Sequence, residues 1–388
     1  MKKTILSLTL LFIKTNTTTF DWTIIGAGPA GITTIGVLLD VGIPENKIAW
    51  IDPEFKVGRL PNYNNVPANN PTSKFIEFIQ NCDTFKKCDS PELAELLTMN
   101  PKEHHPLKII TKPLKCITKQ LRSKVNSFET KMHYLFFEND TWSVLTTSGE
   151  TINSKNVVIA TGSQPKNLSL HTQGTQIPLD VALDKYQLAT VVNENDTIAV
   201  IGSAHSAILI LKFLCDLNVK QIYNFYNKEL IVKKGAKMRI NPMLDVYGVA
   251  AQWIKEVLSK NPPKNLERLK STSENLETIL PECTKTIYAV GYKRNDLPEI
   301  RETSDYSYDK QGAIGPRLFG IGIAFPEMML HHSGELEPKV GLRDFLDYAQ
   351  RMVPAWVSKD YNEKKRSKTI QQQTLLQILD SILDIKLL

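Results

Sequence analysis

The chain has 388 residues, which exceeds one small domain and suits roughly two or three domains of about 150 residues. Hydrophobic residues make up 42% and charged residues 23%, as in globular proteins, so a disordered, collagen-like or coiled-coil chain is excluded. The net charge of +6 is spread without long basic runs, except for a short one near the C-terminus. We therefore expect no nucleic-acid partner.

The N-terminus carries two features of a secretory signal, because Lys2 and Lys3 precede the apolar run Thr4 to Ile13. No Ala-x-Ala cleavage site follows, and the first predicted strand begins a few residues later. We expect a cytoplasmic protein, with a secretory signal over residues 1–19 as the alternative. The apolar run is too short to span a bilayer, so we expect no membrane partner.

The five cysteines are odd in number and form neither CxxC nor the paired spacings of zinc ligands. They are Cys82, Cys88, Cys116, Cys215 and Cys283. This usage favours a reducing compartment without structural disulfides. The seven histidines are scattered without metal-ligand spacing, so we expect no metal site.

The first strong pattern along the chain is a strand, a glycine turn, a helix and a second strand. Trp22 to Ile25 is an apolar run typical of a buried strand, Ile32 to Val41 suits a helix, and Lys47 to Asp52 suits the next strand. Two parallel strands joined by a helix form the right-handed unit of nucleotide-binding sheets.

The turn itself, from Gly26 to Gly31, reads GxGxxG. Gly26 permits the tight turn, Gly28 lets a pyrophosphate approach the backbone, and Gly31 allows the helix to pack against the strand. The other cofactor-binding candidates of this turn are Pro29 and Ala30. Asp52 only accepts hydrogen bonds, so it suits ribose hydroxyls and would repel a 2′-phosphate. The first site therefore favours FAD or NAD and not NADP.

Short alternating runs follow between about Lys108 and Val158, and they predict antiparallel hairpins forming a small meander. Asn139-Asp140 and Ser148-Gly149 supply the turns. Asn156 to Ala160 then returns as a buried strand ending at Thr161-Gly162. Arg59 and the stretch from Asn62 to Thr72, which follow the first unit, suit either a loop over a cofactor edge or an ordinary surface loop.

A second unit begins with the strand Thr197 to Ile201 and turns through Gly202, Ser203, Ala204, His205 and Ser206. Ala204 stands where the middle glycine belongs, and its Cβ would hinder a pyrophosphate. The Ser203 and Ser206 hydroxyls are candidates to compensate with hydrogen bonds.

No carboxylate follows the next strand, which ends at Tyr226. Lys228 is a candidate to pair with a 2′-phosphate, the alternative being a solvated loop lysine. We therefore favour NADPH over NADH at this second site, with NADH as the alternative.

Two more strands with glycines follow, Thr286 to Val290 before Gly291, and the segment Leu318 to Phe325 that contains Gly322. The last stretch, Thr369 to Leu388, has the apolar period of a helix. It suits a helix packed on the body of the protein or one that pairs with a second copy in a homodimer.

Five segments follow one another along the chain in this order: IIGAGPAGI, ATGSQP, the second glycine turn, AVGY and LFGIGIAF. Their sequences and order resemble the FAD/NAD(P)-binding pyridine nucleotide-disulfide oxidoreductase-like superfamily, which includes flavin monooxygenases. The resemblance spans Asp21 to Trp356. It implies an α/β fold of two Rossmann-like dinucleotide-binding domains with parallel sheets, the second inserted into the first, plus a small antiparallel meander. The FAD domain would comprise residues 20–172 and 305–388, and the NAD(P)H domain residues 173–304. It also implies cofactor contacts at Ala160, Thr161, Gly162, Gly291 and Gly322.

These residues indicate the cofactors more clearly than they indicate the reaction. Dithiol reductases of the superfamily need two nearby cysteines beside the flavin, and Cys82 and Cys88 do not have that spacing. We expect an FAD-dependent enzyme that passes hydride from NAD(P)H to the flavin and then to a small-molecule substrate or electron acceptor. The alternatives are a flavin-dependent N- or S-monooxygenase and a non-catalytic FAD-binding protein. No catalytic residue is assigned.

Overall fold

The computed structural model describes residues 18–170, 173–234, 237–241, 244, 246–297, 299–301, 308–309, 312–330 and 336–358. Two expectations fall outside them. These are most of the secretory signal over residues 1–19 and the helix from Thr369 to Leu388.

Within the described residues, nine strands form the first sheet, in the order β16-β4-β5-β6-β1-β2-β3, with β18 also beside β6 and β17 beside β18. Strands β3, β2, β1, β6 and β18 run parallel, and β5 pairs antiparallel with both β4 and β6. The strands are β1 (Thr19–Ile25), β2 (Ile48–Ile51), β3 (Asn126–Phe128), β4 (Met132–Glu138), β5 (Thr141–Thr146), β6 (Thr151–Ile159), β16 (Glu299–Arg301), β17 (Ala313–Gly315) and β18 (Leu318–Gly320).

The predicted meander is confirmed as β4, β5 and β6, and it continues the first sheet directly. Asn139 and Asp140 join β4 to β5 with φ of 50° and 57°, as a type I′ hairpin turn requires. The hairpin prediction is wrong over Lys108–Lys124, which forms helix α5. Its buried Ile110, Leu114, Ile117 and Leu121 recur with the period of a helix rather than of a strand.

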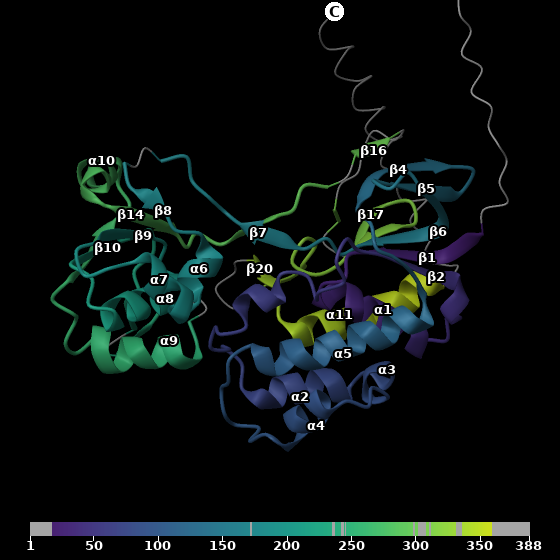
Figure 1. Cartoon of the computed structure of the whole chain (residues 1–388), viewed down its shortest axis with the longest axis horizontal. Helices are drawn as coiled ribbons and strands as arrows, with labels where there is room; N and C mark the ends of the chain where they lie inside the picture. Colours follow the sequence, from purple (N-terminus) through teal and green to yellow (C-terminus); the bar gives the residue numbers. More distant parts are fainter. Residues whose placement is uncertain are drawn as a thin grey trace, which may run out of the picture.

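Five parallel strands form the second sheet in the part of the chain described, in the order β13-β10-β9-β14-β8. They are β8 (Thr175–Gln176), β9 (Thr197–Ile201), β10 (Gln221–Tyr226), β13 (Leu266–Lys270) and β14 (Lys285–Tyr288). All of them come between β6 and β16 in the sequence, so the second sheet is inserted into the first. We call the two sheets with their helices the first and second lobes (Figure 1).

Three antiparallel strand pairs complete the described strands. One pair, β7 (Ser163–Pro165) with β15 (Tyr292–Arg294), lies between the lobes (Figure 1). The other two are β11 (Ile231–Lys234) with β12 (Lys237–Ile240), and β19 (Glu327–Leu330) with β20 (Leu336–Lys339).

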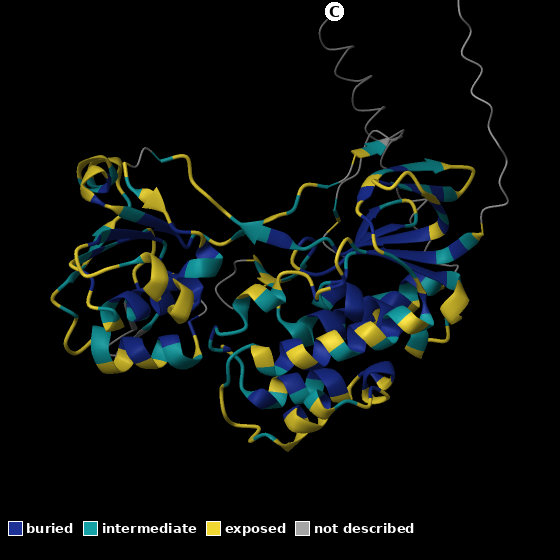
Figure 2. Ribbon diagram, in the orientation of Figure 1, coloured by how far each residue is buried: buried dark blue, intermediate teal, exposed yellow. Residues whose placement is uncertain are grey.

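Helices pack on both lobes, and the central strands β1, β2 and β9 are mostly buried, whereas β8 is exposed (Figure 2). In the first lobe they are α1 (Pro29–Asp40), α2 (Thr72–Gln80), α3 (Asp83–Lys86), α4 (Pro91–Thr98), α5 and α11 (Leu342–Val357), with short turns η1 (Glu45–Lys47) and η2 (Leu60–Tyr63). In the second lobe they are α6 (Leu179–Leu183), α7 (Lys185–Val191), α8 (His205–Asp216), α9 (Gly248–Trp253), η4 (Ile254–Leu258), α10 (Ser273–Ile279) and η5 (Leu280–Glu282). The predicted helix at Ile32 to Val41 is therefore α1.

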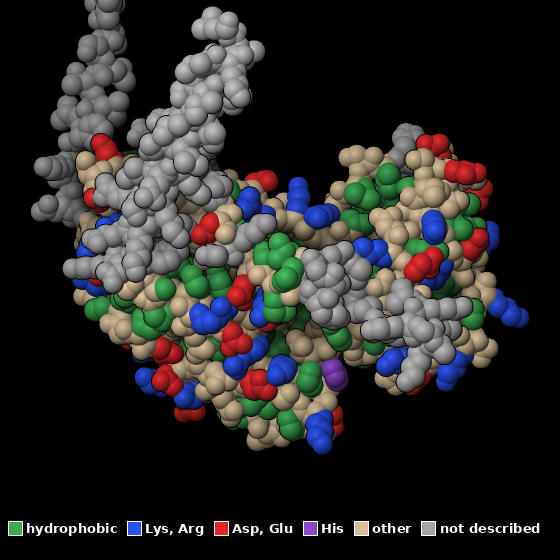
Figure 3. All heavy atoms as spheres, turned by 180° about the vertical axis from the view of Figure 1, so that it is seen from behind, with side chains coloured by type: hydrophobic (Ala, Val, Ile, Leu, Met, Phe, Trp, Pro, Cys, Tyr) green, Lys and Arg blue, Asp and Glu red, His purple; other side chains and the backbone are tan. Residues whose placement is uncertain are grey.

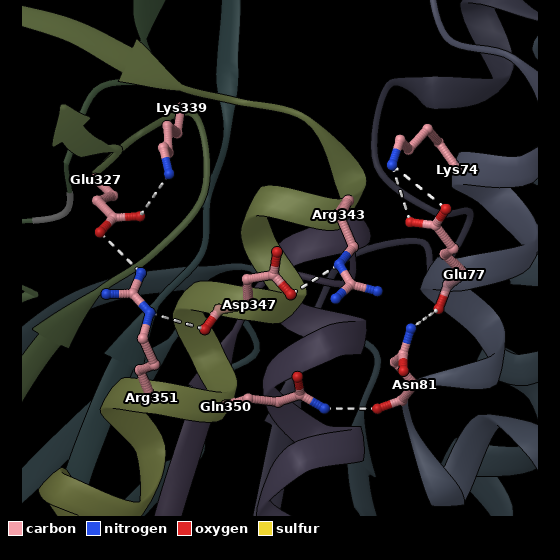
Figure 4. Close-up of polar contacts among 9 residues, drawn as sticks. All are labelled: Lys74, Glu77, Asn81, Glu327, Lys339, Arg343, Asp347, Gln350 and Arg351. Carbon is pink, nitrogen blue, oxygen red and sulfur yellow. Dashed lines mark hydrogen bonds and ion pairs between the residues drawn. The ribbon is translucent and has the colours of Figure 1, made fainter. Parts of the chain in front are cut away.

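Helix α11 closes the first lobe by packing against α1, and polar contacts fix its outer face (Figure 4). Arg351 donates to Glu327 at 2.8 Å, which ties α11 to strand β19. Gln350 donates to the carbonyl of Asn81 at 2.5 Å, which ties α11 to the end of α2. Exposed contacts of this kind add little stability individually.

These findings confirm the predicted fold class of two Rossmann-like lobes with an antiparallel meander. The domain limits at residues 172, 173, 304 and 305 stay predictions. On the face in Figure 3, basic and acidic side chains of the described residues are interspersed. No described helix has both the length and the apolar character needed to cross a membrane.

Candidate functional site: two nucleotide turns

The first glycine turn passes against the backbone of a neighbouring strand. Gly26 has a φ of 110°, and a Cβ there would lie 2.4 Å from the carbonyl oxygen of Ala160. A Cβ on Gly31 would lie 2.0 Å from the Gly26 oxygen. Both positions therefore require glycine, for the reasons of tight turning and close helix packing that the sequence predicts.

Gly28 differs because its surroundings are open. It precedes α1 as the N-cap with a φ of −75°, and a Cβ would meet only the Cα of Gly58, at 3.9 Å. Pro29 begins the helix, where its missing N–H costs nothing. The free N–H groups of the first helical turn and the helix dipole offer a place for a phosphate beside Gly28.

Asp52 is largely engaged by the protein itself. One carboxylate oxygen accepts from the N–H of Ala27 at 2.7 Å, and the other accepts from the N–H groups of Glu54 and Phe55 at 2.9 and 2.7 Å. A carboxylate offers about four lone-pair sites, so about one is left for a ribose hydroxyl. Asp52 thus also fixes the glycine turn to the loop that follows β2.

The segment Ala160–Gly162 crosses the same edge of the first sheet. Ala160 donates its N–H to Ile25 at 2.8 Å, and Gly162 has a φ of 72°. The hydroxyl of Thr161 is buried without a hydrogen-bond partner, although Asn295 binds its carbonyl at 2.7 Å. An unpaired buried hydroxyl is costly, so this one suits a bound polar ligand.

Gly322 belongs to the same place, since a Cβ there would lie 2.5 Å from the Cβ of Ala30 at the start of α1. The structure thus gathers Gly26 to Gly31, Ala160 to Gly162 and Gly322 at one edge. The open side of Gly28 and the unpaired Thr161 hydroxyl fit a dinucleotide such as FAD.

The second turn repeats this geometry. Gly202 has a φ of 130°, and a Cβ would lie 2.2 Å from the oxygen of Ala289, as Gly26 does with Ala160. Ala204 is exposed at the N-cap of α8, so its methyl group stands where a phosphate would approach. Ser203 is buried and Ser206 is half-buried.

His205, the first residue of α8, carries a buried ring nitrogen, Nδ1, with no partner, and burial lowers its pKa. The sequence places His205 in the second glycine turn and suggests no cofactor contact for it. Like the Thr161 hydroxyl at the first turn, this ring nitrogen lacks a hydrogen-bond partner that a ligand at the second turn would supply.

Lys228 is exposed in the loop after β10, beside the strand end predicted to hold the ribose. Sequence reasoning missed Arg268, on the neighbouring strand β13, whose guanidinium lies 4.7 Å from the ring of Tyr226. The two residues are far apart in sequence and meet only through strand pairing, so no local signal pointed to this contact.

Gly291 lies between β14 and β15, with a φ of 88° and no atom within 4 Å of an added Cβ. Its carbonyl accepts from Lys166 at 2.9 Å, which joins the two chain crossings between the lobes. No described protein atom crowds this position, and the left-handed backbone there favours glycine. The cofactor contact expected at Gly291 stays a prediction.

Polar side chains join the lobes beside these crossings. Asp180 of α6 accepts hydrogen bonds from Arg59, from Asn62 at 2.9 Å and from Tyr63 at 2.7 Å. Tyr292, which follows Gly291, has its hydroxyl 3.2 Å from that of Tyr63. We call these five residues the interlobe cluster; part of the predicted loop, Arg59 to Tyr63, thus contacts the second lobe.

The cluster pairs the Asp180 carboxylate with the Arg59 guanidinium, and its two phenols form a chain in which Tyr292 donates to Tyr63 and Tyr63 donates to Asp180. Burial alone would raise the pKa of Asp180, but hydrogen bonds from Tyr63 and Asn62 and the charge of Arg59 hold it below its ordinary value. Burial raises the pKa of both Tyr63 and Tyr292. The phenols therefore remain donors at neutral pH.

All five cysteines are described, and all are free thiols. Cys82 lies against Gly36 of α1 and donates to Asp40 at 3.2 Å, away from the first turn of that helix. Burial raises the pKa of Cys215 to about 12 and that of Cys283 to about 11, so neither is a ready thiolate. No described cysteine is paired beside the first glycine turn.

The chain and its structure are similar to several known proteins. The chain is 29% identical to the monooxygenase AgnR1 of Paecilomyces divaricatus over 86% of this chain and 97% of that protein. Its structure is similar to a bacillithiol disulfide reductase of Staphylococcus aureus, with a TM-score of 0.58, 12% identity and coverage of 88% and 99% of the two chains. It is equally similar to a flavin-containing monooxygenase of Stenotrophomonas maltophilia, with a TM-score of 0.58, 13% identity and coverage of 87% and 98%.

At 12% and 13% sequence identity, the two solved structures are evidence for the fold only. The model of the pyridine nucleotide-disulphide oxidoreductase family matches residues 20–317, which is most of the chain. This protein therefore belongs to the pyridine nucleotide-disulphide oxidoreductase family of FAD- and NAD(P)-dependent enzymes.

Proposed function

We propose that this protein is an FAD-dependent monooxygenase that uses NADPH as its reductant. The observation that carries the proposal is the combination of two nucleotide turns with five unpaired thiols, none of them placed beside the first turn. Electron transfer to a disulfide acceptor would need a thiol pair beside the flavin, which the described cysteines do not provide. Molecular oxygen takes electrons from reduced flavin without a thiol. The similarity to a monooxygenase over most of the chain supports the same reading.

Residues of the first lobe would hold FAD. The open face of Gly28 and the start of α1 would take the pyrophosphate, and Asp52 would accept from one ribose hydroxyl. The unpaired Thr161 hydroxyl would gain a partner where the chain crosses to the second lobe. When bound, FAD supplies a hydride acceptor that reacts with O2 once reduced, which no side chain can provide.

The second lobe would hold NADPH at the turn beginning with Gly202, and the interlobe cluster would set the two turns relative to each other. Because Tyr63 and Tyr292 remain protonated, their hydroxyl groups act as hydrogen-bond donors between the lobes. Overall, the reaction would consume one NADPH, one proton and one O2. It would return NADP⁺, water and a substrate bearing one added oxygen atom.

A variant with all five cysteines replaced by serine tests the proposal. It should release one FAD per chain on denaturation and be reduced by NADPH within a few-fold of the wild-type rate. Absorbance of the flavin released on denaturation measures the first, and flavin absorbance during anaerobic mixing measures the second. The reduced variant should then be reoxidised by air as the wild type is. A folded, FAD-loaded variant that NADPH still reduces but that no longer consumes NADPH steadily in air would place a thiol relay after the flavin and contradict the proposal.

A further inference from the structure

Arg268 is a half-buried cation near the second nucleotide turn that the proposed function has not used. It lies on β13 next to Asn224 of β10, in a parallel pair whose register places Tyr226 opposite Lys270. In nucleotide-binding sheets of this type, the carboxyl end of the second strand lies at the adenosine ribose. Arg268 therefore lies two residues from the level of that strand end.

A chain of hydrogen bonds fixes the Arg268 side chain relative to the glycine turn. Its Nε donates to the side-chain oxygen of Asn224 at 2.9 Å, and the amide nitrogen of Asn224 donates to the carbonyl of Gly202 at 2.7 Å. The same amide donates to Val200 at 3.1 Å, so Asn224, which is fully buried, has a fixed orientation. The guanidinium is thus oriented by the turn that would hold the coenzyme.

One guanidinium nitrogen lacks an acceptor. Nη2 of Arg268 is buried and has no hydrogen-bond partner, while the Tyr226 ring lies over the guanidinium. The nearby Glu229 carboxylate instead accepts from the Tyr226 hydroxyl at 3.1 Å. A buried cationic N–H without an acceptor is unfavourable, and a phosphate oxygen is among its best partners.

We propose that Arg268 recognises the 2′-phosphate of the NADPH adenosine, with Asn224 as its positioning residue. This inference rests on the proposed use of a nicotinamide coenzyme. The phosphate gives Nη2 the acceptor it lacks, after the half-buried Tyr226 ring shifts outward. Lys228 adds positive charge from the solvent side, but Arg268 supplies the directed hydrogen bond that separates NADPH from NADH.

Equilibrium binding of NADP⁺ and NAD⁺ to the flavin-loaded protein, measured by titration calorimetry, tests this. The wild type should bind NADP⁺ more tightly. Arg268→Gln keeps an amide donor at the position of Nε for Asn224 and loses the guanidinium nitrogens. It should therefore weaken NADP⁺ by about tenfold or more and change NAD⁺ by less than about twofold. Arg268→Lys should fall between, because it keeps the charge but not the fork of donors.

Lys264→Gln is the matched control, because it removes one positive charge at the opposite end of the same strand. It should leave both affinities unchanged. Equal loss of NADP⁺ and NAD⁺ affinity in Arg268→Lys, or no loss in either Arg268 variant, would overturn the assignment. Arg268→Lys decides the matter alone if Arg268→Gln does not fold.

The same titration keeps this inference separate from the proposed function. A wild type that binds neither coenzyme contradicts the proposed function as well as the inference. A wild type that is reduced by NADPH but binds NADP⁺ and NAD⁺ equally contradicts only the role of Arg268.

Discussion

The glycines of the first turn are present for two different reasons, one structural and one connected with ligand binding. Gly26 is confined by the Ala160 carbonyl and by its positive φ, whereas Gly28 has ordinary backbone angles and open surroundings. Any residue can adopt the Gly28 backbone, so folding does not require a glycine there. The open face is then explained by what has to approach it.

This contrast gives a matched pair of variants. Gly28→Ala should fold with a melting temperature near that of the wild-type apoprotein and lose most of its FAD, because the methyl group occupies the pyrophosphate approach. Gly26→Ala should lose the fold itself, by several kcal/mol, roughly the cost of a backbone clash and a strained φ. Flavin absorbance and thermal melts measure the two effects. Full FAD content in Gly28→Ala would contradict the assignment of the first site.

Ala204 allows the complementary change at the second turn. Because its exposed methyl group stands at the N-cap of α8, Ala204→Gly should tighten NADP⁺ and NAD⁺ about equally, since both share the pyrophosphate. Calorimetric affinities measure this. A gain for one coenzyme alone would place the methyl group near the adenosine ribose instead.

The residues predicted from sequence were those whose role is local. The need for Gly26, Gly31 and Gly202 is recognisable from a turn of six residues and holds in the structure, which adds that distant carbonyls of Ala160 and Ala289 also confine Gly26 and Gly202. The unpaired guanidinium of Arg268 depends on which strand lies beside β10, and the engagement of Asp52 depends on the path of the loop after β2. The strand pairing of Arg268 and the bond from Ala27 to Asp52 have no signature in neighbouring residues, whereas the bonds from Glu54 and Phe55 to Asp52 are local.

At the scale of elements, the interlobe cluster connects η2 of the first lobe to α6 of the second. Its central group, Asp180, has a pKa below its ordinary value, so its contribution to stability is present above the unfolded pKa of about 4. That contribution is lost as the pH falls through the still lower folded pKa. Acid should therefore loosen this connection between the lobes.

Asp180→Asn removes the charge while keeping the shape. It should lower the free energy of unfolding by about 1 kcal/mol at pH 7, and the difference should shrink progressively below about pH 4. Thermal or urea unfolding between pH 3 and 7 measures it. Glu54→Gln, which changes an exposed carboxylate, is the control and should have no effect. A deficit that stays constant down to pH 3 would rule out the charge as the cause.

Element prediction succeeded where turns and apolar runs agree and failed at α5. The left-handed pair Asn139 and Asp140 marks its hairpin clearly. Helix α5 instead carries Pro113 in its interior, yet it buries one continuous face against the first lobe. Burial of that face in the tertiary structure decides that the segment is a helix. The alternating runs later in the same stretch led to a hairpin prediction that hid the helical period of Lys108–Lys124.

At the scale of the whole molecule, two similar turns face one connection built from β7, β15 and the interlobe cluster. We propose that the first turn holds FAD and the second a nicotinamide coenzyme. The account therefore depends most on electrons passing from the second site to the first and then to oxygen.

An anaerobic titration followed by air tests that central claim. NADPH should bleach the flavin at about one equivalent per FAD and at lower concentration than NADH, and air alone should then restore the yellow colour. Flavin absorbance near 450 nm, a typical value for oxidised flavin, follows both steps. Failure of both coenzymes to bleach a fully loaded protein, or reoxidation that requires a disulfide rather than oxygen, would contradict the account.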